Sequence, residues 1–128
     1  KSTSAKVHIN VSMFGEFGLE GLLFNHMVFF KRIVGATTTD LKNTSTGGAI
    51  AEGINCLTRT FAGVDNNSTP EAGSFSYVDE PNTTSAATYQ VWMFANGNAD
   101  FCLNRTYGGT IALAYEYGMS TMTATCYH

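Results

Sequence analysis

The stretch GSFSYVDEPNTTSAATYQVWMFANGNADFCLNRTYGGTIA, residues 73–112, decides the fold. Its first segment alternates small polar with large apolar residues, and its second is rich in aromatic and β-branched residues. A period of two is typical of a strand with one buried face. Proline and an Asn-Gly pair mark the turns between segments, so the stretch predicts an all-β domain. The predicted strands are 74–78, 88–94 and 100–104, with turns at 79–82 and 96–98.

The rest of the chain extends this pattern over a single domain, residues 1–128. Lys6 to Phe14 alternates most clearly, and Leu22 to Val34 is apolar on both faces, as in a strand covered on both sides. Seven or eight strands on a chain of this length predict an antiparallel β-sandwich or jelly roll. The remaining expectations are a loop at 36–48, one strand or two short ones at 49–62, a turn region at 64–72, and an alternating strand within 112–127.

The composition indicates where such a protein works. Charged residues are only 13% of the chain, about half the usual share, so Thr, Ser, Asn and Gly must cover the surface. Such a surface suits extracellular or virion proteins and subunits that hide surface in an oligomer, and a Thr-rich β-protein without a special partner is the alternative. The net charge of −3 and the single basic pair Lys31-Arg32 argue against nucleic acid as a partner. The apolar run 21–30 is too short for membrane insertion.

Groups that carry chemistry are few and scattered. The histidines lie at positions 8, 26 and 128, so no metal site, no cofactor and no enzymatic activity are expected. Asp79-Glu80, the most conspicuous carboxylate pair, is interpreted as loop polarity, and no catalytic residue is assigned. The three cysteines are interpreted as buried free thiols, and a Cys102–Cys126 disulfide requires that their strands be neighbours.

Aromatic residues concentrate in the last third of the chain. If Tyr89, Val91 and Met93 face inward, then Gln90, Trp92 and Phe94 face the other side, which makes both faces of that strand apolar. A second apolar face predicts a subunit interface or an exposed binding patch. The interface or core candidates are Tyr89, Trp92, Phe94, Tyr115 and Tyr117. If the protein is instead a carbohydrate-binding module, the candidates for glycan contact are Trp92, Asn96, Asn98 and Tyr107.

Several segments resemble a domain of structural proteins of tailed bacteriophages. They are the run from Ser74 to Val91, Cys102-Leu-Asn-Arg-Thr and Met119-Ser-Thr-Met-Thr-Ala, with weaker similarity at Lys6–Met13 and Met27-Val-Phe-Phe-Lys. Proteins of that family carry a Pro-x-Thr-Thr-Ser segment before Thr-Tyr, then an Asn-Arg pair, then a closing strand. This chain departs from the pattern in its closing Thr-Ala-Thr-Cys-Tyr-His and in lacking the usual sequence before the first strand, which leaves the first edge strand unaccounted for.

The resemblance implies a jelly roll that trimerises like proteins of the tumour-necrosis-factor type. It implies a non-enzymatic virion protein, a module of a tail fibre, tail knob or capsid decoration, either alone or as the C-terminal part of a longer fibre-like chain. The expected partners are other copies of the chain and other virion proteins, with a host-surface glycan as a further option for host attachment. In these segments Pro81, Asn104 and Arg105 are interpreted as a structural motif. The candidate partners of Arg105 are Asp79, Glu80, Asp100 and a neighbouring subunit.

Overall fold

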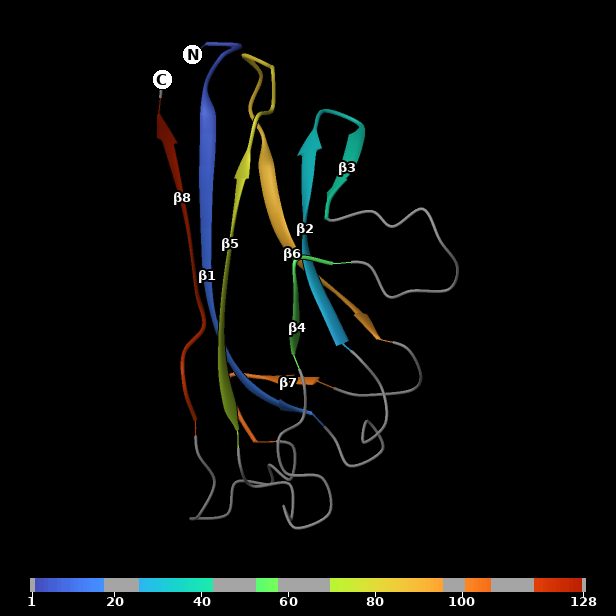
Figure 1. Cartoon of the computed structure of the whole chain (residues 1–128), viewed down its shortest axis with the longest axis vertical. Helices are drawn as coiled ribbons and strands as arrows, with labels where there is room; N and C mark the ends of the chain where they lie inside the picture. The colour runs from blue at the N-terminus through green and yellow to red at the C-terminus, as the bar shows by residue number, and fades with distance from the viewer. Residues whose placement is uncertain are drawn as a thin grey trace.

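A computed structural model describes residues 2–17, 26–42, 53–57, 70–95, 101–106 and 117–127 of the chain. These residues form strands and no helix (Figure 1), so the predicted all-β class is confirmed for them. The same ranges contain no helix long and apolar enough to cross a membrane. The strands are β1 (Lys6–Phe17), β2 (His26–Val34), β3 (Thr37–Leu41), β4 (Asn55–Leu57), β5 (Glu71–Asp79), β6 (Thr88–Ala95), β7 (Phe101–Leu103) and β8 (Thr121–Tyr127).

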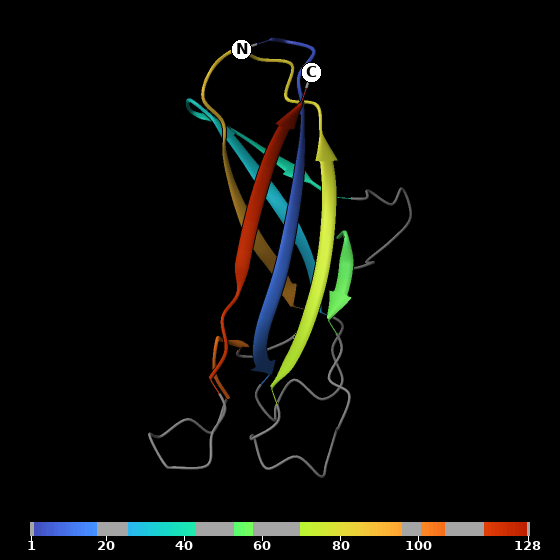
Figure 2. The same ribbon diagram turned by 90° about the vertical axis from the view of Figure 1, so that its left-hand side faces the viewer.

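The strands form two antiparallel sheets that pack as a β-sandwich (Figure 2). In the first sheet β1 is central, with β5 on one side and β8 and β7 end to end on the other. In the second sheet β2 is central, with β6 on one side and β3 and β4 end to end on the other. The two strands with the clearest apolar patterns, β1 and β2, are therefore the central strands of the two sheets.

The core lies between β1 and β2. Alternate residues of β1 (Ile9, Val11, Met13) point inward and meet Val28 and Phe30 of β2. Phe75 of β5 and Leu41 of β3 complete the cluster, and the Phe30 and Phe75 rings lie 5.2 Å apart between centroids. The alternation predicted for the strands 6–14 and 74–78 is confirmed, because Val7, Ile9, Val11 and Met13 of the first and Phe75 and Tyr77 of the second face this core. Val78, at the end of the second, is exposed on the other face.

The prediction of a loop at 36–48 is wrong for its first part, because Thr37–Leu41 is strand β3. This strand forms a hairpin with β2, from Val34 opposite Thr37 to Phe30 opposite Leu41. Gly35 has a φ of +57°, the left-handed conformation that a tight hairpin turn requires. The run of threonines that suggested a loop is compatible with a strand, because β-branched residues fit a pleated surface. The rest of the predicted loop, 43–48, lies outside the described residues.

One other boundary differs from expectation, and one expected strand is found. Glu71 and Ala72, predicted to belong to a turn region, begin β5 and pair with Gly15 and Phe14. The ambiguous segment 49–62 contributes the short strand β4, which pairs with the start of β2. The strand expected within 49–62 is thus found in the described residues 55–57. The pairing of Glu71 and Ala72 was missed because it depends on β1 extending as far as Gly15, which strand propensity does not show.

A buried ion pair joins the two sheets at one end of the sandwich. Arg32 of β2 donates to both carboxylate oxygens of Asp79, at 2.7 and 3.0 Å, and the Tyr89 hydroxyl donates to Asp79 Oδ2 at 2.8 Å. Asp79 is only 4% exposed. The interpretation of Asp79 as loop polarity is therefore wrong, because the residue ends a strand and its carboxylate is held between sheets.

The hydroxyl of Tyr89 makes the free energy of unfolding depend on pH in the alkaline range. Burial, and then the hydrogen bond to Asp79, raise the pKa of Tyr89 well above its usual range. The folded state therefore holds this proton more tightly than the unfolded state, whose tyrosine pKa is about 10. The contribution of Tyr89 is fully present below pH ~10 and is lost as the pH rises further.

We expect Tyr89→Phe to remove this part of the pH dependence. The variant should be less stable than the wild type at neutral pH, because it lacks the hydrogen bond to Asp79, and the difference should shrink above pH ~10. Urea unfolding of both proteins between neutral and alkaline pH measures it. If the difference in free energy of unfolding between the two proteins stayed constant across that pH range, the pKa of Tyr89 would not be raised by folding.

Candidate functional site

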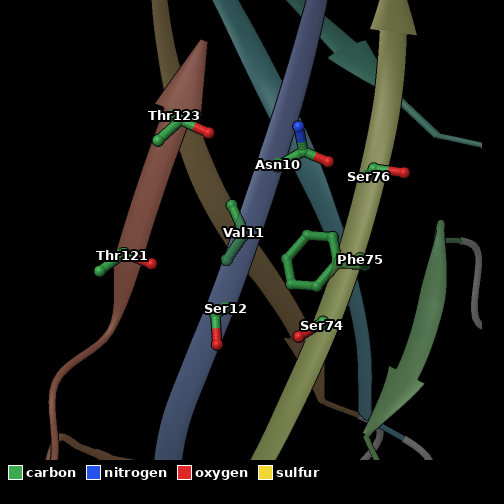
Figure 3. Close-up of a pocket in the computed structure, with 8 residues that line it drawn as sticks. All are labelled: Asn10, Val11, Ser12, Ser74, Phe75, Ser76, Thr121 and Thr123. Carbon is green, nitrogen blue, oxygen red and sulfur yellow. The ribbon is translucent and has the colours of Figure 1, made fainter.

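The outer face of the first sheet is polar and uncharged over its middle (Figure 3). Asn10 lies in register between Ser76 and Thr123, and Ser12 between Ser74 and Thr121. These six side chains, which we call the hydroxyl face, border a shallow depression of about 390 Å³. They offer hydrogen-bond donors and acceptors but no acid, base or charge, so the surface is suited to water or other neutral polar groups.

The outer face of the second sheet is apolar in contrast. Val28 and Phe30 of β2 point into the core, so Met27, Phe29 and Lys31 lie on the outside of the sandwich. Register places Phe94 opposite Met27 and Trp92 opposite Phe29 on the neighbouring strand β6. We call Met27, Phe29, Trp92 and Phe94 the aromatic face. Trp92 is 45% exposed and Phe94 47% exposed, whereas Phe29 is buried.

The Trp92 indole is held by two polar neighbours. The Lys31 ammonium lies 3.7 Å from the centroid of the ring, and the indole Nε1 donates a hydrogen bond of 3.0 Å to Gln90 Oε1. A cation over an indole face is the best case of a cation–π contact. Lys42 lies similarly over Phe29, at 5.6 Å from its centroid. The large exposed ring therefore has two polar contacts that favour this orientation.

The division of strand 88–94 into two faces is confirmed. Tyr89, Val91 and Met93 pack against the core, and Trp92 and Phe94 are exposed on the opposite face. Trp92 therefore belongs to the outside of the sandwich and not to the contact between sheets. Tyr117 is also exposed, at 61%, beyond the end of β7. Tyr115, Asn96, Asn98 and Tyr107 lie outside the described residues.

Asn104 links three strands through its hydrogen bonds. Its Oδ1 accepts from both the backbone N–H and the hydroxyl of Ser120, each at 2.7 Å, and its own N–H donates to Phe14 O at 2.8 Å. Its φ of +65° is left-handed, a conformation that asparagine tolerates better than most residues. Asn104 thus joins the end of β7 to β1 and to the start of β8.

The other two residues of the predicted motif lie just after strands. Pro81 opens the loop after β5, where Asn82 adopts a φ of +49° and its Nδ2 donates to Glu80 O. Arg105 forms an isolated bridge with Tyr117. Two of the acidic partners suggested for Arg105 pair elsewhere, Asp79 with Arg32 and Glu80 with Lys6.

The two cysteines whose side chains the structure describes, Cys102 and Cys126, are free thiols, and neither is buried. Cys102 pairs in register with Glu16 and Cys126 with Val7, at opposite ends of β1, so their strands lie end to end and not side by side. A Cys102–Cys126 disulfide is therefore excluded in this fold. Cys126 is exposed and Cys102 is half-buried, which corrects the expectation of buried thiols. Among the described strands, β8 pairs with β1 alone, which leaves Cys126 accessible. The described residues contain no cluster of metal-ligating side chains.

Sequence reasoning missed the contact of Lys31 with the Trp92 ring of the aromatic face. Its contact with Trp92 depends on the antiparallel register of β2 and β6, which no local pattern reveals. The only signal was the period of two that puts Lys31 on the same side as Phe29. No family model, no curated protein and no solved structure matches this chain, so its function has to be inferred from these surfaces and from the resemblance noted above.

Proposed function

We propose that this chain is a non-enzymatic structural module of a virion that assembles as a homotrimer through the aromatic face. The observation that carries the proposal is the contrast between the two outer faces of the sandwich. One is covered by Ser, Thr and Asn, and the other presents Trp92 and Phe94, each nearly half exposed. Aromatic residues and methionine are enriched at protein interfaces, whereas a face destined for water gains nothing from them.

The preorganisation of Trp92 supports an interface. A side chain already fixed by Lys31 and Gln90 loses little conformational freedom when a partner packs against it. Phe29, the cross-strand neighbour of Trp92, is buried. Packed aromatic residues at the centre of an interface are where binding energy usually concentrates.

The three-fold symmetry and the virion rest on the resemblance to phage structural proteins. An apolar face alone would fit a dimer as well as a trimer, whereas the resemblance favours a trimeric jelly roll in a tail fibre, tail knob or capsid decoration. The structure supports the two-sheet sandwich that a jelly roll requires, with β1, β5, β7 and β8 in one sheet and β2, β3, β4 and β6 in the other. The low share of charged residues agrees with a subunit that hides surface.

A carbohydrate-binding module is the second candidate. The exposed indole of Trp92 favours it, because a fixed, flat ring beside an amide is a platform on which a sugar ring can stack. The two candidates differ in what Trp92→Ala changes. In a glycan-binding module the variant loses retention on immobilised neutral glycans and keeps its mass, and in an assembly module it loses mass.

The experiment is the mass in solution, measured by light scattering at dilute concentration. We expect the wild type to give roughly three times the monomer's 13.8 kDa. Replacing Trp92 and Phe94 by aspartate together should bring the mass down to the monomer, because a charge in an apolar contact carries a large desolvation cost. Both residues are exposed in the single chain, so the variant should still fold.

Val78→Asp is the matched control. Val78 is 47% exposed, like Phe94, but it lies on the outer face of the first sheet opposite His8. This change should leave the trimer intact. A stable mass near 13.8 kDa for the wild type would rule out the assembly, and dissociation by Val78→Asp alone would place the contact on the other face.

A further inference from the structure

A small polar pocket lies at the end of the sandwich that holds the buried ion pair. In Figure 1 the hairpin of β2 and β3 and the loop between β5 and β6 lie at this same end. The pocket has a volume of about 240 Å³. It is lined by one arginine, three threonines and two apolar residues, namely Arg32, Val34, Thr37, Thr39, Pro81 and Thr83. Two segments that are far apart in the sequence therefore form its walls.

The register of the hairpin directs polar side chains into this pocket. Thr39 lies opposite Arg32 in the β2–β3 ladder, and Thr37, two residues earlier on β3, shares the same face of the sheet. From that face Arg32 reaches Asp79 of the other sheet. Thr38 lies between the two threonines and, because side chains alternate along a strand, points to the outside of the sandwich. Thr37 and Thr39 are thus the two threonines of β3 that a molecule in the pocket can contact.

Arg32 has hydrogen-bond donors that the fold does not use. A guanidinium carries five N–H groups. The Nη1 of Arg32 donates to both carboxylate oxygens of Asp79, and its Nη2 makes one long contact of 3.4 Å with Thr39 Oγ1. The Nε–H and the second N–H of Nη2 have no protein partner within the described ranges. The Arg32 side chain is 17% exposed and lines the pocket, so strong donors remain accessible there.

The threonine hydroxyls complement these donors. Thr39 Oγ1 accepts from Arg32, and Thr83 Oγ1 accepts from the backbone N–H of Ser85 at 3.1 Å, so both hydroxyl hydrogens can be donated to a ligand. Thr37 is exposed, and its side chain makes no hydrogen bond within the described residues. The pocket therefore offers both donors and acceptors, and Arg32 is the one charged residue among those that line it.

We infer that this pocket binds one ring of a neutral sugar. Hydroxyl oxygens of the sugar accept from the unused N–H groups of Arg32, its O–H groups bond to the threonines, and its C–H face packs on Val34 and Pro81. Asp79 already balances the charge of Arg32, and a second carboxylate would compete with it for the same guanidinium, so the ligand is neutral.

The size of the pocket limits the ligand to a single ring. A few polar groups placed beside apolar ones are typical of small-molecule sites, and the volume here is below the ~300–1,000 Å³ usual for drug-sized ligands. None of the described residues that line the pocket belongs to the aromatic face, so this site is separate from the proposed contact between subunits.

The test is saturation-transfer difference NMR on the whole chain, a measurement that detects weak sugar binding. The ligands are the methyl glycosides of glucose, galactose, mannose, fucose, rhamnose and N-acetylglucosamine. We expect at least one of them to bind saturably. The double variant Thr37→Val with Thr39→Val should weaken that binding at least ~10-fold, because it removes two hydroxyls without changing the shape of the side chains, and two hydrogen bonds are together worth about a factor of ten.

Thr38→Val is the matched control. It makes the same substitution on the same strand, but at an exposed residue on the outer side of the hairpin, so this variant should bind the sugar as the wild type does. Circular dichroism of the variants confirms that they fold.

Three results would overturn the inference. They are no saturable binding of any of the six sugars, binding by the double variant equal to that of the wild type, and an equal loss in Thr38→Val. If Trp92→Ala abolished the binding, the sugar would lie on the aromatic face, and the inference would again be wrong. The mass measurement on the Trp92 and Phe94 variant involves no sugar, so failure of the proposed assembly leaves the sugar result standing.

Discussion

Phe30→Ala is expected to destabilise the fold by about 3–5 kcal/mol, the usual cost of deleting a large aromatic side chain from a core. Phe30 is completely buried at the centre of β2 and packs against the ring of Phe75 on the opposite sheet. Its removal therefore leaves a cavity at the point where the two sheets meet. Urea unfolding followed by circular dichroism measures the change in the free energy of unfolding.

Phe94→Ala is the control for Phe30→Ala, because it makes the same substitution at an exposed position. It deletes the same side chain from a residue that is 47% exposed on the aromatic face. In the dissociated chain it should change the free energy of unfolding by less than about 1 kcal/mol, because exposed positions contribute little. If Phe30→Ala and Phe94→Ala had equal effects under dissociating conditions, the core would not lie where the structure places it.

The sequence predicted strands best where the pattern was local. Alternation at Lys6–Phe14 and 74–78 placed Ile9, Val11 and Phe75 on the correct face, because every second residue of a half-buried strand is apolar. The strand 88–94 was assigned correctly to two faces for the same reason. These successes concern elements whose environment can be read from their own residues.

The failures concern pairings between distant residues. Thr37–Leu41 was interpreted as a loop from its composition, and only its ladder with β2 makes it a strand. Lys31 meets Trp92, and Asn104 meets Ser120, through registers that no single segment encodes. Asp79 was judged from its neighbours in sequence, Glu80 and Pro81, although its partner Arg32 lies 47 positions away. A local pattern therefore predicted the strands of this fold, and the side-chain contacts between them required the structure.

Asp79→Asn should lower the free energy of unfolding by about 3 kcal/mol, the lower end of the range for breaking a buried ion pair. The lower end applies because the Arg32 side chain is 17% exposed and retains some water, whereas Asp79 is 4% exposed. The change leaves the Arg32 guanidinium without a counter-charge between the sheets. Asparagine still offers an oxygen to the Tyr89 hydroxyl, so the loss reports mainly on the charge.

The exposed pair Lys6–Glu80 is the control for Asp79→Asn. Its atoms are as close, 2.6 Å against 2.7 Å, but its side chains are 50% and 58% exposed, so Glu80→Gln should leave the unfolding midpoint almost unchanged. The double variant Arg32→Met with Asp79→Asn should recover part of the lost stability, because it removes the uncompensated charge. Equal effects of Asp79→Asn and Glu80→Gln would mean that water screens both pairs alike, and Asp79 would then not join the sheets. Burial, rather than distance, therefore decides which of the two ion pairs stabilises this sandwich.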